Sequence, residues 1–218
     1  YTFQVKEVDS DDNMPEDADG MTFDTNTATV TVNVSDNHDG TLSAKVTYAN
    51  TNHGDITDQA VFENKYEASM NYGAEGKGGI NVTKTIRDRS MANGDYSFTI
   101  TGEDGAADLV TNADKNFTNT AAQVNGKSTM AKLQSLTFDE TDAGKTYTFI
   151  VDEVMPADAD KIAGVVYDQS EYRVSIEVVD NGDGTMHTLT TVTQIKDKDG
   201  NETDKDLVDH ANSDEQSY

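Results

Sequence analysis

One strand-like segment occurs twice in the chain and most constrains how it folds. Residues 1–8 read YTFQVKEV and residues 147–154 read YTFIVDEV. Both are rich in aromatic and β-branched residues and contain no Gly or Pro, which predicts strands. Because side chains alternate between the faces of a strand, Glu7 and Glu153 each end the more apolar face. We expect that face to be buried. A buried carboxylate is costly unless it is paired or protonated, so each copy needs a partner for its glutamate.

The chain around these two segments is also repeated. Phe23-Asp24 matches Tyr167-Asp168, 144 positions later, and the turn DNHDGT at 36–41 matches DNGDGT at 180–185. A repeat of this length indicates tandem copies of one domain. We therefore predict that residues 1–68 are the C-terminal half of a first domain. Residues 69–79, rich in Gly, are predicted to be a linker, and residues 80–218 a second, nearly complete domain.

Apolar and polar residues alternate along most of the other segments, which predicts all-β structure with antiparallel sheets. Asp, Asn and Gly fill the turns between them, and long helical periodicity is absent from the sequence. The expected strands are 28–34, 42–48, 60–66, 80–86, 96–100, 133–138 and 174–178, whereas residues 102–132 are irregular and have room for short strands or a turn of helix.

Charge and cysteine content exclude several classes of function. The formal net charge is −25, which excludes a protein that binds nucleic acid by neutralising phosphates and disfavours anionic membrane surfaces. The sequence has no Cys, so a covalent staple cannot be a disulfide. It also has no apolar run long enough to insert into a membrane. The chain begins within a strand, which we interpret as the start of a fragment.

Polar residues interrupt the apolar faces of three other strands. Lys84 shares a face with Ile80 and Val82, and Asn64 lies between Phe62 and Tyr66. In the second copy, Asn212 is the best match for Asn64, because 57 residues separate Glu7 from Asn64 and 59 separate Glu153 from Asn212. His210 and Asp214 stand where the first copy has Phe62 and Tyr66, so the face around Asn212 is less apolar. Each residue alone can be a snorkelling or strand-end side chain, but together they indicate one site.

A buried Lys–Glu pair beside an Asn can form an amide bond. Desolvation lowers the pKa of a lysine and raises that of a glutamate, so the two can share a proton as neutral amine and neutral acid. The neutral amine is a nucleophile, and the protonated carboxyl can polarise the Asn amide and protonate the leaving ammonia. The predicted product is a Lys–Asn isopeptide bond, made once per chain.

Five motifs in this order resemble the pilin isopeptide linkage domain of Gram-positive surface proteins. They are NVTKTI at 81–86, GDYSF at 94–98, YTFIVDE at 147–153, DNGDGT at 180–185 and FENKY at 62–66. The resemblance implies tandem immunoglobulin-like β-sandwiches with Greek-key-type topology in a pilus shaft or adhesin stalk. It implies that Lys84 is the amine donor, Glu153 the catalytic acid/base and Asn212 the acceptor, with Glu7 and Asn64 in the same roles in the truncated first domain.

The resemblance also sets expectations for the setting of the protein. The parent protein would be extracellular, on the bacterial cell surface and anchored to the cell wall. Its partners would be neighbouring copies of the repeat or other pilin subunits. It would be no enzyme beyond a single self-ligation and would need no cofactor or metal. Because the Lys of the first copy would lie upstream of Tyr1, we expect one bond in this chain.

Two other readings remain open at this stage. An adhesin domain would bind host glycan or protein through its loops, although the sequence has no Trp for a stacking platform. A Ca²⁺-dependent module is suggested by the acidic loop at 9–20 and by the Asp, Asp, Gly and Asp at 197, 199, 200 and 206, but Ile195 stands at the first ligand position. The four His, at 38, 53, 187 and 210, show no spacing of a metal site or triad.

Overall fold

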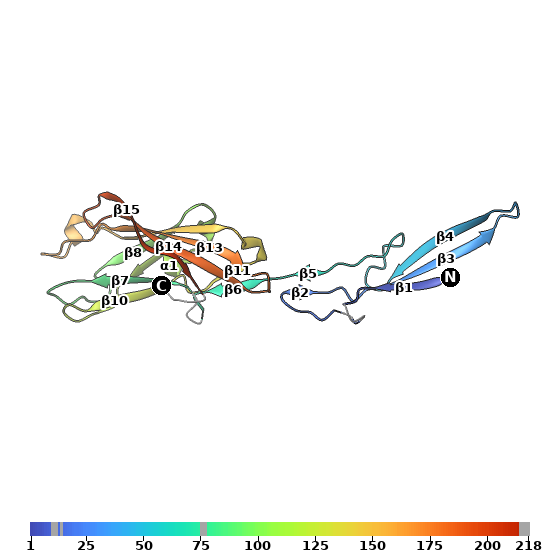
Figure 1. The fold of residues 1–218 in the computed structure, drawn as a ribbon. Helices are drawn as coiled ribbons and strands as arrows, with labels where there is room; N and C mark the ends of the chain where they lie inside the picture. The colour runs from blue at the N-terminus through green and yellow to red at the C-terminus, as the bar shows by residue number, and fades with distance from the viewer. Residues whose placement is uncertain (10–12, 14, 75–77, 214–218) are drawn as a thin grey trace. The chain divides into compact units, whose positions relative to one another are not determined.

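The computed structural model describes residues 1–9, 13, 15–74 and 78–213 (Figure 1). The chain forms two compact units. Unit 1 contains residues 1–67 and 182–184, and unit 2 contains the rest. Part of the acidic loop at 9–20, and Asp214, lie outside the described residues.

Unit 1 is built on one three-stranded antiparallel sheet. Its strands are β1 (Thr2–Lys6), β3 (Thr27–Asp36) and β4 (Leu42–Asn50), and β3 lies in the middle. Two short strands, β2 (Met21–Thr22) and β5 (Lys65–Tyr66), pair beside this sheet. The face expected to be buried is instead open, because Tyr1, Phe3 and Val5 are 82%, 55% and 40% exposed. Within the described residues of unit 1, β3 is the only strand that pairs with β1.

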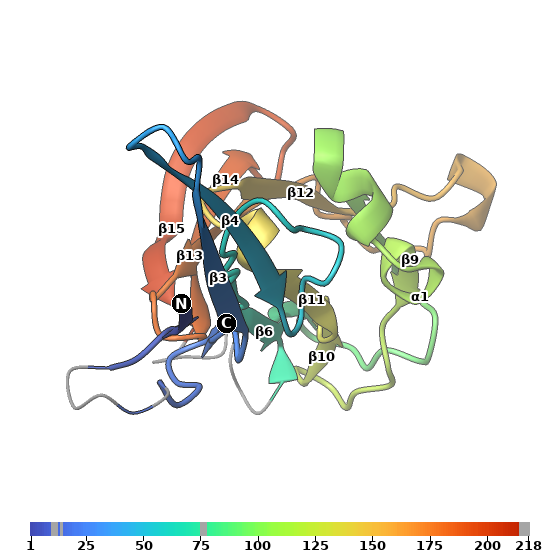
Figure 2. The same cartoon turned by 90° about the vertical axis from the view of Figure 1, so that its right-hand side faces the viewer.

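Unit 2 is an antiparallel β-sandwich, which confirms the all-β prediction (Figure 2). Its larger sheet has the order β15-β14-β13-β12-β8-β9, and two further strand pairs, β10-β7 and β11-β6, complete it. The strands are β6 (Ser69–Tyr72), β7 (Ile80–Thr85), β8 (Ser97–Gly102), β9 (Asn116–Thr118), β10 (Lys127–Lys132), β11 (Leu136–Asp139), β12 (Thr146–Glu153), β13 (Glu171–Asp180), β14 (Met186–Lys196) and β15 (Glu202–Asn212). Helical segments are short: α1 (Asn112–Lys115) and the 3-10 turns η2 (Asp104–Leu109), η3 (Glu140–Asp142) and η4 (Asp158–Asp160).

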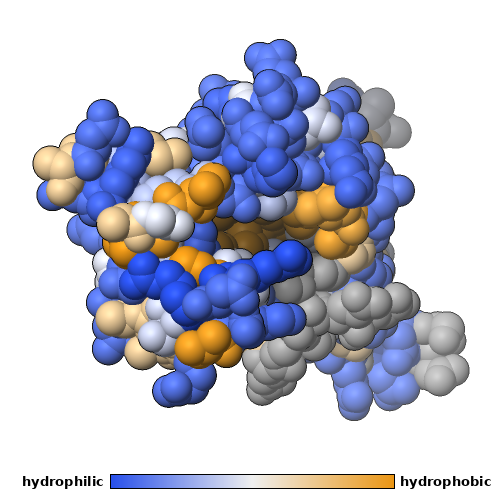
Figure 3. All heavy atoms as spheres, turned by 90° about the vertical axis from the view of Figure 1, so that its left-hand side faces the viewer, coloured by the Kyte–Doolittle hydropathy of each residue, from blue (hydrophilic) through white to orange (hydrophobic). Residues whose placement is uncertain are grey.

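The core of unit 2 includes the apolar face of the repeated strand. Phe149 and Val151 of β12 are 0% and 5% exposed, and Val174 and Ile176 of β13 are buried beside them. The alternation read from the sequence therefore places the expected face inward in this unit. Other apolar side chains reach the surface in separate patches within a hydrophilic surface (Figure 3).

The two units share the strand register that the repeat predicts. Phe3 lies opposite Val30, and Val30 opposite Tyr48. In unit 2 the corresponding pairs are Phe149 with Val174, and Val174 with Val192. Unit 1 thus corresponds to strands β12, β13 and β14 of unit 2. In unit 2 the other edge of β12 pairs with β8, whereas among the described strands of unit 1 none pairs with the corresponding edge of β1.

Residues 69–72, predicted to lie in a linker, are strand β6 of unit 2. Tyr72 is fully buried, and its ring packs edge-on against Phe138 at 6.3 Å. The glycines that suggested a linker have a packing role here: Gly78 has φ +77°, and a Cβ atom on it would lie 2.2 Å from the Tyr72 ring. Gly is the residue that tolerates both conditions.

The stretch 102–132 contains short elements of the kind the sequence allowed, α1, β9 and β10. The buried face of β10 consists of Ser128 and Met130, so its signal in the sequence is short and half polar. The predicted strand 60–66 is reduced to β5, because side chains rather than a neighbouring strand hold the backbone of residues 61–63.

Candidate functional site

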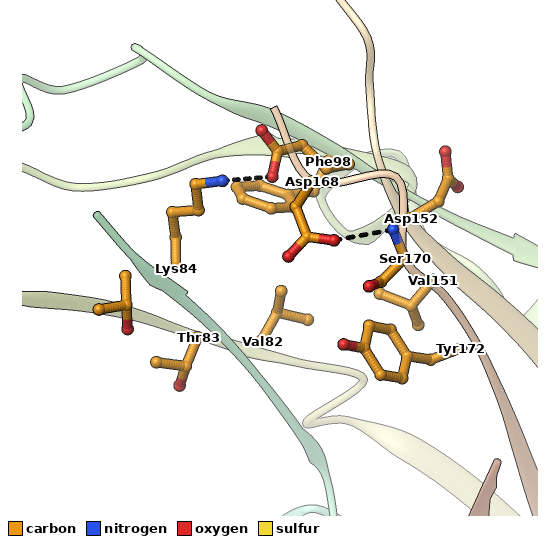
Figure 4. Close-up of a pocket in the computed structure, with 11 residues that line it drawn as sticks. Val82, Thr83, Lys84, Phe98, Val151, Asp152, Asp168, Ser170 and Tyr172 are labelled. Atoms are coloured by element: carbon orange, nitrogen blue, oxygen red, sulfur yellow. Dashed lines mark hydrogen bonds and ion pairs between the residues drawn. The ribbon is translucent and has the colours of Figure 1, made fainter. Parts of the chain in front are cut away.

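The two charged residues predicted to meet in unit 2 form a buried ion pair. Lys84 projects from β7, and Glu153 lies at the end of β12 in the six-stranded sheet. Lys84 Nζ is 2.5 Å from Glu153 Oε2, and the side chains are only 11% and 7% exposed (Figure 4). The pair therefore joins strands of different sheets within the sandwich.

Aromatic rings surround this ion pair. Lys84 Nζ lies 4.4 Å from the centroid of the Tyr96 ring, a cation–π contact. Phe98 of β8 stands opposite Glu153 in the strand register. Burial raises the pKa of Glu153, the hydrogen bond and charge of Lys84 lower it, and the charge of Asp168 raises it again. The net upward shift brings the carboxyl closer to the neutral form that a proton donor needs.

A cavity of about 210 Å³ opens beside the pair. Its lining includes Lys84, Glu153, Phe98, Asp168 and Ser170 (Figure 4). Within the described residues, Glu153 Oε1 is buried and accepts no hydrogen bond. One oxygen of the glutamate thus holds the amine, and the other has no donor.

The corresponding glutamate of unit 1 holds an asparagine. Asn64 Nδ2 donates to Glu7 Oε1 at 2.8 Å, and the backbone N–H of Asp24 donates to Asn64 Oδ1 at 2.9 Å. Glu7 Oε2 is buried and, within the described residues, accepts no hydrogen bond. Both atoms of the Asn64 amide group are therefore held, one by a carboxylate and one by a main-chain donor.

The two arrangements are complementary halves of one constellation. In unit 2 the glutamate binds the amine and has an oxygen without a donor, and in unit 1 it binds the amide and also has an oxygen without a donor. Placing both on one glutamate gives a lysine amine on one oxygen and an asparagine amide on the other.

The turn that carries Asp24 is present in both units. Asp24 Oδ1 accepts from the Asn26 N–H at 2.8 Å, and Asp168 Oδ1 accepts from the Ser170 N–H at 2.9 Å (Figure 4). These two aspartates match each other in the sequence repeat, which by itself assigns them no role. The turn they share, Asp-Xaa-Asn/Ser directly after an aromatic residue, is the signal that could have pointed to them.

A polar network fixes this turn in unit 1. Asp24 Oδ2 lies 2.6 Å from His53 Nε2 and accepts from the Glu63 N–H at 2.9 Å. Asn26 Nδ2 donates to Asn50 Oδ1 and to the Val61 carbonyl. These bonds tie the turn to the segment that presents Asn64.

The corresponding turn of unit 2 is also hydrogen-bonded to the neighbouring strand. Gln194, the counterpart of Asn50, donates through Nε2 to Ser170 Oγ at 3.2 Å. The turn of unit 2 is thus attached to β14 as the turn of unit 1 is attached to β4.

The structure does not bring Asn212 to Lys84 and Glu153. Asn212 lies opposite Leu189, Leu189 opposite Glu177, and Glu177 opposite Thr146. Thr146 begins β12 and Glu153 ends it, so the two levels differ by about 23 Å along the strands at the usual rise per residue.

Comparison with family models gives one match, over residues 1–67 and 80–211, to the Spy0128-like isopeptide containing domain, FctA. The chain belongs to this family. The matched residues cover nearly the whole chain and include Glu7, Asn64, Lys84 and Glu153. FctA chains are structural pilin modules of Gram-positive surface pili, which also confirms the immunoglobulin-like expectation for the fold. No curated protein and no solved structure matches the chain.

Among the described residues, no helix is long and apolar enough to cross a membrane. No group of three or more His, Asp or Glu side chains in that part of the chain is placed to hold a metal ion. At the loop suggested for Ca²⁺, Asp197 accepts hydrogen bonds from Asn201 and from the Asp199 N–H within its own turn.

Proposed function

We propose that the chain is a surface pilus module whose domains are locked by Lys–Asn isopeptide bonds that their own residues form. Lys84 is the amine donor and Glu153 transfers the protons. The acceptor is an asparagine presented as Asn64 is presented in unit 1. The observation that carries the proposal is a pair of half-sites: in unit 2 Glu153 binds Lys84 through one carboxylate oxygen and has the other without a donor, and in unit 1 Glu7 binds the Asn64 amide in the same way.

An apolar groove beside β7 supports the proposal that the acceptor asparagine lies on a strand. A cavity of about 480 Å³ runs between β7 and the larger sheet, lined by Ile80, Val82, Val151, Val192, Leu207 and Val208 among others. Among the described strands, β10 is the only one that pairs with β7. A strand carrying apolar residues on either side of an asparagine, as residues 61–66 do, has the pattern that fits this groove.

Asn212 remains a predicted acceptor that the strand register disfavours. Bond formation at Asn212 would require β15 to leave its pairing with β14. Because the bond is made once, the proposed chain has no turnover as an enzyme. The family supports neighbouring repeats or other pilin subunits as its partners, and a parent protein anchored to the cell wall is part of the same proposal.

A peptide of residues 60–68 (AVFENKYEA) tests the proposal. Mixed with the full chain, it is expected to form a covalent adduct whose intact mass is the sum of the two minus one ammonia. The same peptide with Asn64→Ala, and the chain with Glu153→Ala, are expected to give no adduct.

The intact mass of the chain alone separates the two acceptors. A chain that has lost ammonia through a Lys84–Asn212 link would establish Asn212 as the acceptor. An unchanged mass, together with no adduct at saturating peptide that binds the folded chain, would overturn the proposed bond.

A further inference from the structure

The geometry points to a third participant in this reaction, which rests on the function proposed above. We propose that the backbone N–H of Asp168 in unit 2, and of Asp24 in unit 1, is the oxyanion donor for the acceptor asparagine. No side chain is required for this role, so the identity of the residue alone does not reveal it.

Unit 1 shows the donor in place. The Asp24 N–H lies 2.9 Å from Asn64 Oδ1, within the range in which a donor stabilises a developing oxyanion. The opposite end of the same amide, Nδ2, is held by Glu7 at 2.8 Å. The amide carbon therefore lies between a donor that can stabilise negative charge on Oδ1 and a carboxyl group that can protonate Nδ2.

Unit 2 shows the same turn beside the amine. Asp168 lines the cavity that contains Lys84 and Glu153, and it forms the same turn through Ser170 (Figure 4). Among the described residues, the Asp168 N–H finds no acceptor, in contrast to the Asp24 N–H. Asp168 thus lines the space that an acceptor amide would enter, and its N–H is unused among the described residues.

Each step of the reaction then has a group to serve it. Lys84 first passes one proton to Glu153, and the neutral Nζ attacks Cγ of the asparagine. As the N–C bond forms, the carbonyl electron pair moves onto Oδ1, where the Asp168 N–H stabilises the negative charge. Glu153 gives its proton to Nδ2 and takes one from Nζ; the C–Nδ2 bond breaks, the carbonyl re-forms and ammonia leaves.

The turn is held rigidly enough for such a donor to be preorganised. The carboxylate of Asp24 is hydrogen-bonded to four surrounding groups, the Asn26 and Glu63 N–H groups and the side chains of Asn52 and His53, so the turn at residue 24 is fixed before the amide binds. In unit 2 the Asp168 carboxylate accepts the corresponding hydrogen bond from the Ser170 N–H, the counterpart of the bond from the Asn26 N–H in unit 1. A donor that needs no reorganisation lowers the barrier more than it strengthens ground-state binding.

Replacing the Asp168 amide with an ester tests the donor directly. Incorporating the α-hydroxy analogue of aspartate at 168 removes one N–H and keeps the side chain and its bond to Ser170. The same exchange at Val166, which is 93% exposed, is the matched control. We expect the ester at 168 to slow adduct formation with the 60–68 peptide by about 10²–10³-fold, the usual effect of losing one oxyanion donor.

Peptide affinity provides the second readout. In the Glu153→Ala background, which does not react, the ester at 168 should weaken peptide binding by less than about tenfold, the worth of one neutral hydrogen bond. An unchanged rate of adduct formation would overturn the inference and leave the isopeptide proposal standing. A rate loss matched by an equal loss of affinity would also overturn it, because the N–H would then only position the peptide. Failure of the unmodified chain to form adduct would refute the proposed function itself.

Discussion

The buried ion pair predicts a strong asymmetry between substitutions of its two members in the unreacted chain. Glu153→Ala leaves the Lys84 ammonium in a site that is only 11% exposed, with the Tyr96 ring as its remaining partner. Removing one member of a buried pair costs about 3–5 kcal/mol in the free energy of unfolding. We expect unit 2 to lose stability by that amount at pH 7.

Lys84→Met should cost less, because the remaining partner can become neutral. The pKa of Glu153 is already raised by burial, and loss of Lys84 removes the hydrogen bond and charge that oppose this rise. A group whose pKa is higher in the folded state stabilises the fold fully below its unfolded pKa, about 4.5, and that stabilisation is lost as the pH rises through the folded value. The Lys84→Met variant should therefore be least impaired at pH 4 and become less stable toward pH 7.

The combined variant Lys84→Met/Glu153→Gln removes both charges and should recover most of the loss, as neutral replacements of buried pairs do. Glu7→Ala is the matched control in unit 1, where the bond lost is one from the Asn64 amide and the expected cost is about 1–2 kcal/mol. Urea unfolding followed by circular dichroism and tyrosine fluorescence measures all four. Equal costs for Glu153→Ala and Glu7→Ala would refute the reasoning.

Other features give three further predictions. Phe149→Ala should cost about 3–5 kcal/mol because its side chain is fully buried, whereas Phe3→Ala at the equivalent, half-exposed position should cost well under half of that; similar costs in urea unfolding would show that the face of β1 is covered in solution. The hydrogen bond from His53 holds the pKa of Asp24 well below its usual range, so Asp24 stabilises unit 1 above its unfolded pKa of about 3.8, and this stabilisation is lost as the pH falls below that value. Asp24→Asn should flatten that acid limb of the unfolding profile, and an unchanged limb would count against the pair. Excess chelator should leave the melting temperature unchanged, and a clear decrease would revive the Ca²⁺ reading.

The repeated strand was the most informative part of the sequence because its alternation is strict. The period of two located β12, placed Phe149 and Val151 inside, and made Glu153 stand out as a carboxylate on the buried face. Lys84 was found in the same way, since a charged residue interrupts an otherwise apolar strand face. The sequence repeat predicted the shared register of the two units.

The parts that were missed depend on tertiary contacts. Asn212 was aligned by spacing, but spacing along the chain does not fix the level at which β15 pairs with β14, and the bulges in that pairing shift it further. Strand β6 was hidden because the glycines beside it were interpreted as flexible, whereas Gly78 allows the close approach of Tyr72. The Asp24 N–H could not be found from side-chain patterns at all, because the group that bonds Asn64 belongs to the main chain.

The most direct test of the central claim is the mass spectrum of a protease digest of the chain after incubation with the 60–68 peptide. The two half-sites, joined on one glutamate, predict a single branched product in which Lys84 is linked through an amide to the Asn64 side chain of the peptide, with the loss of one ammonia. That product should be absent from the Glu153→Ala chain. A link through another lysine, or the same link formed equally well without Glu153, would contradict the account.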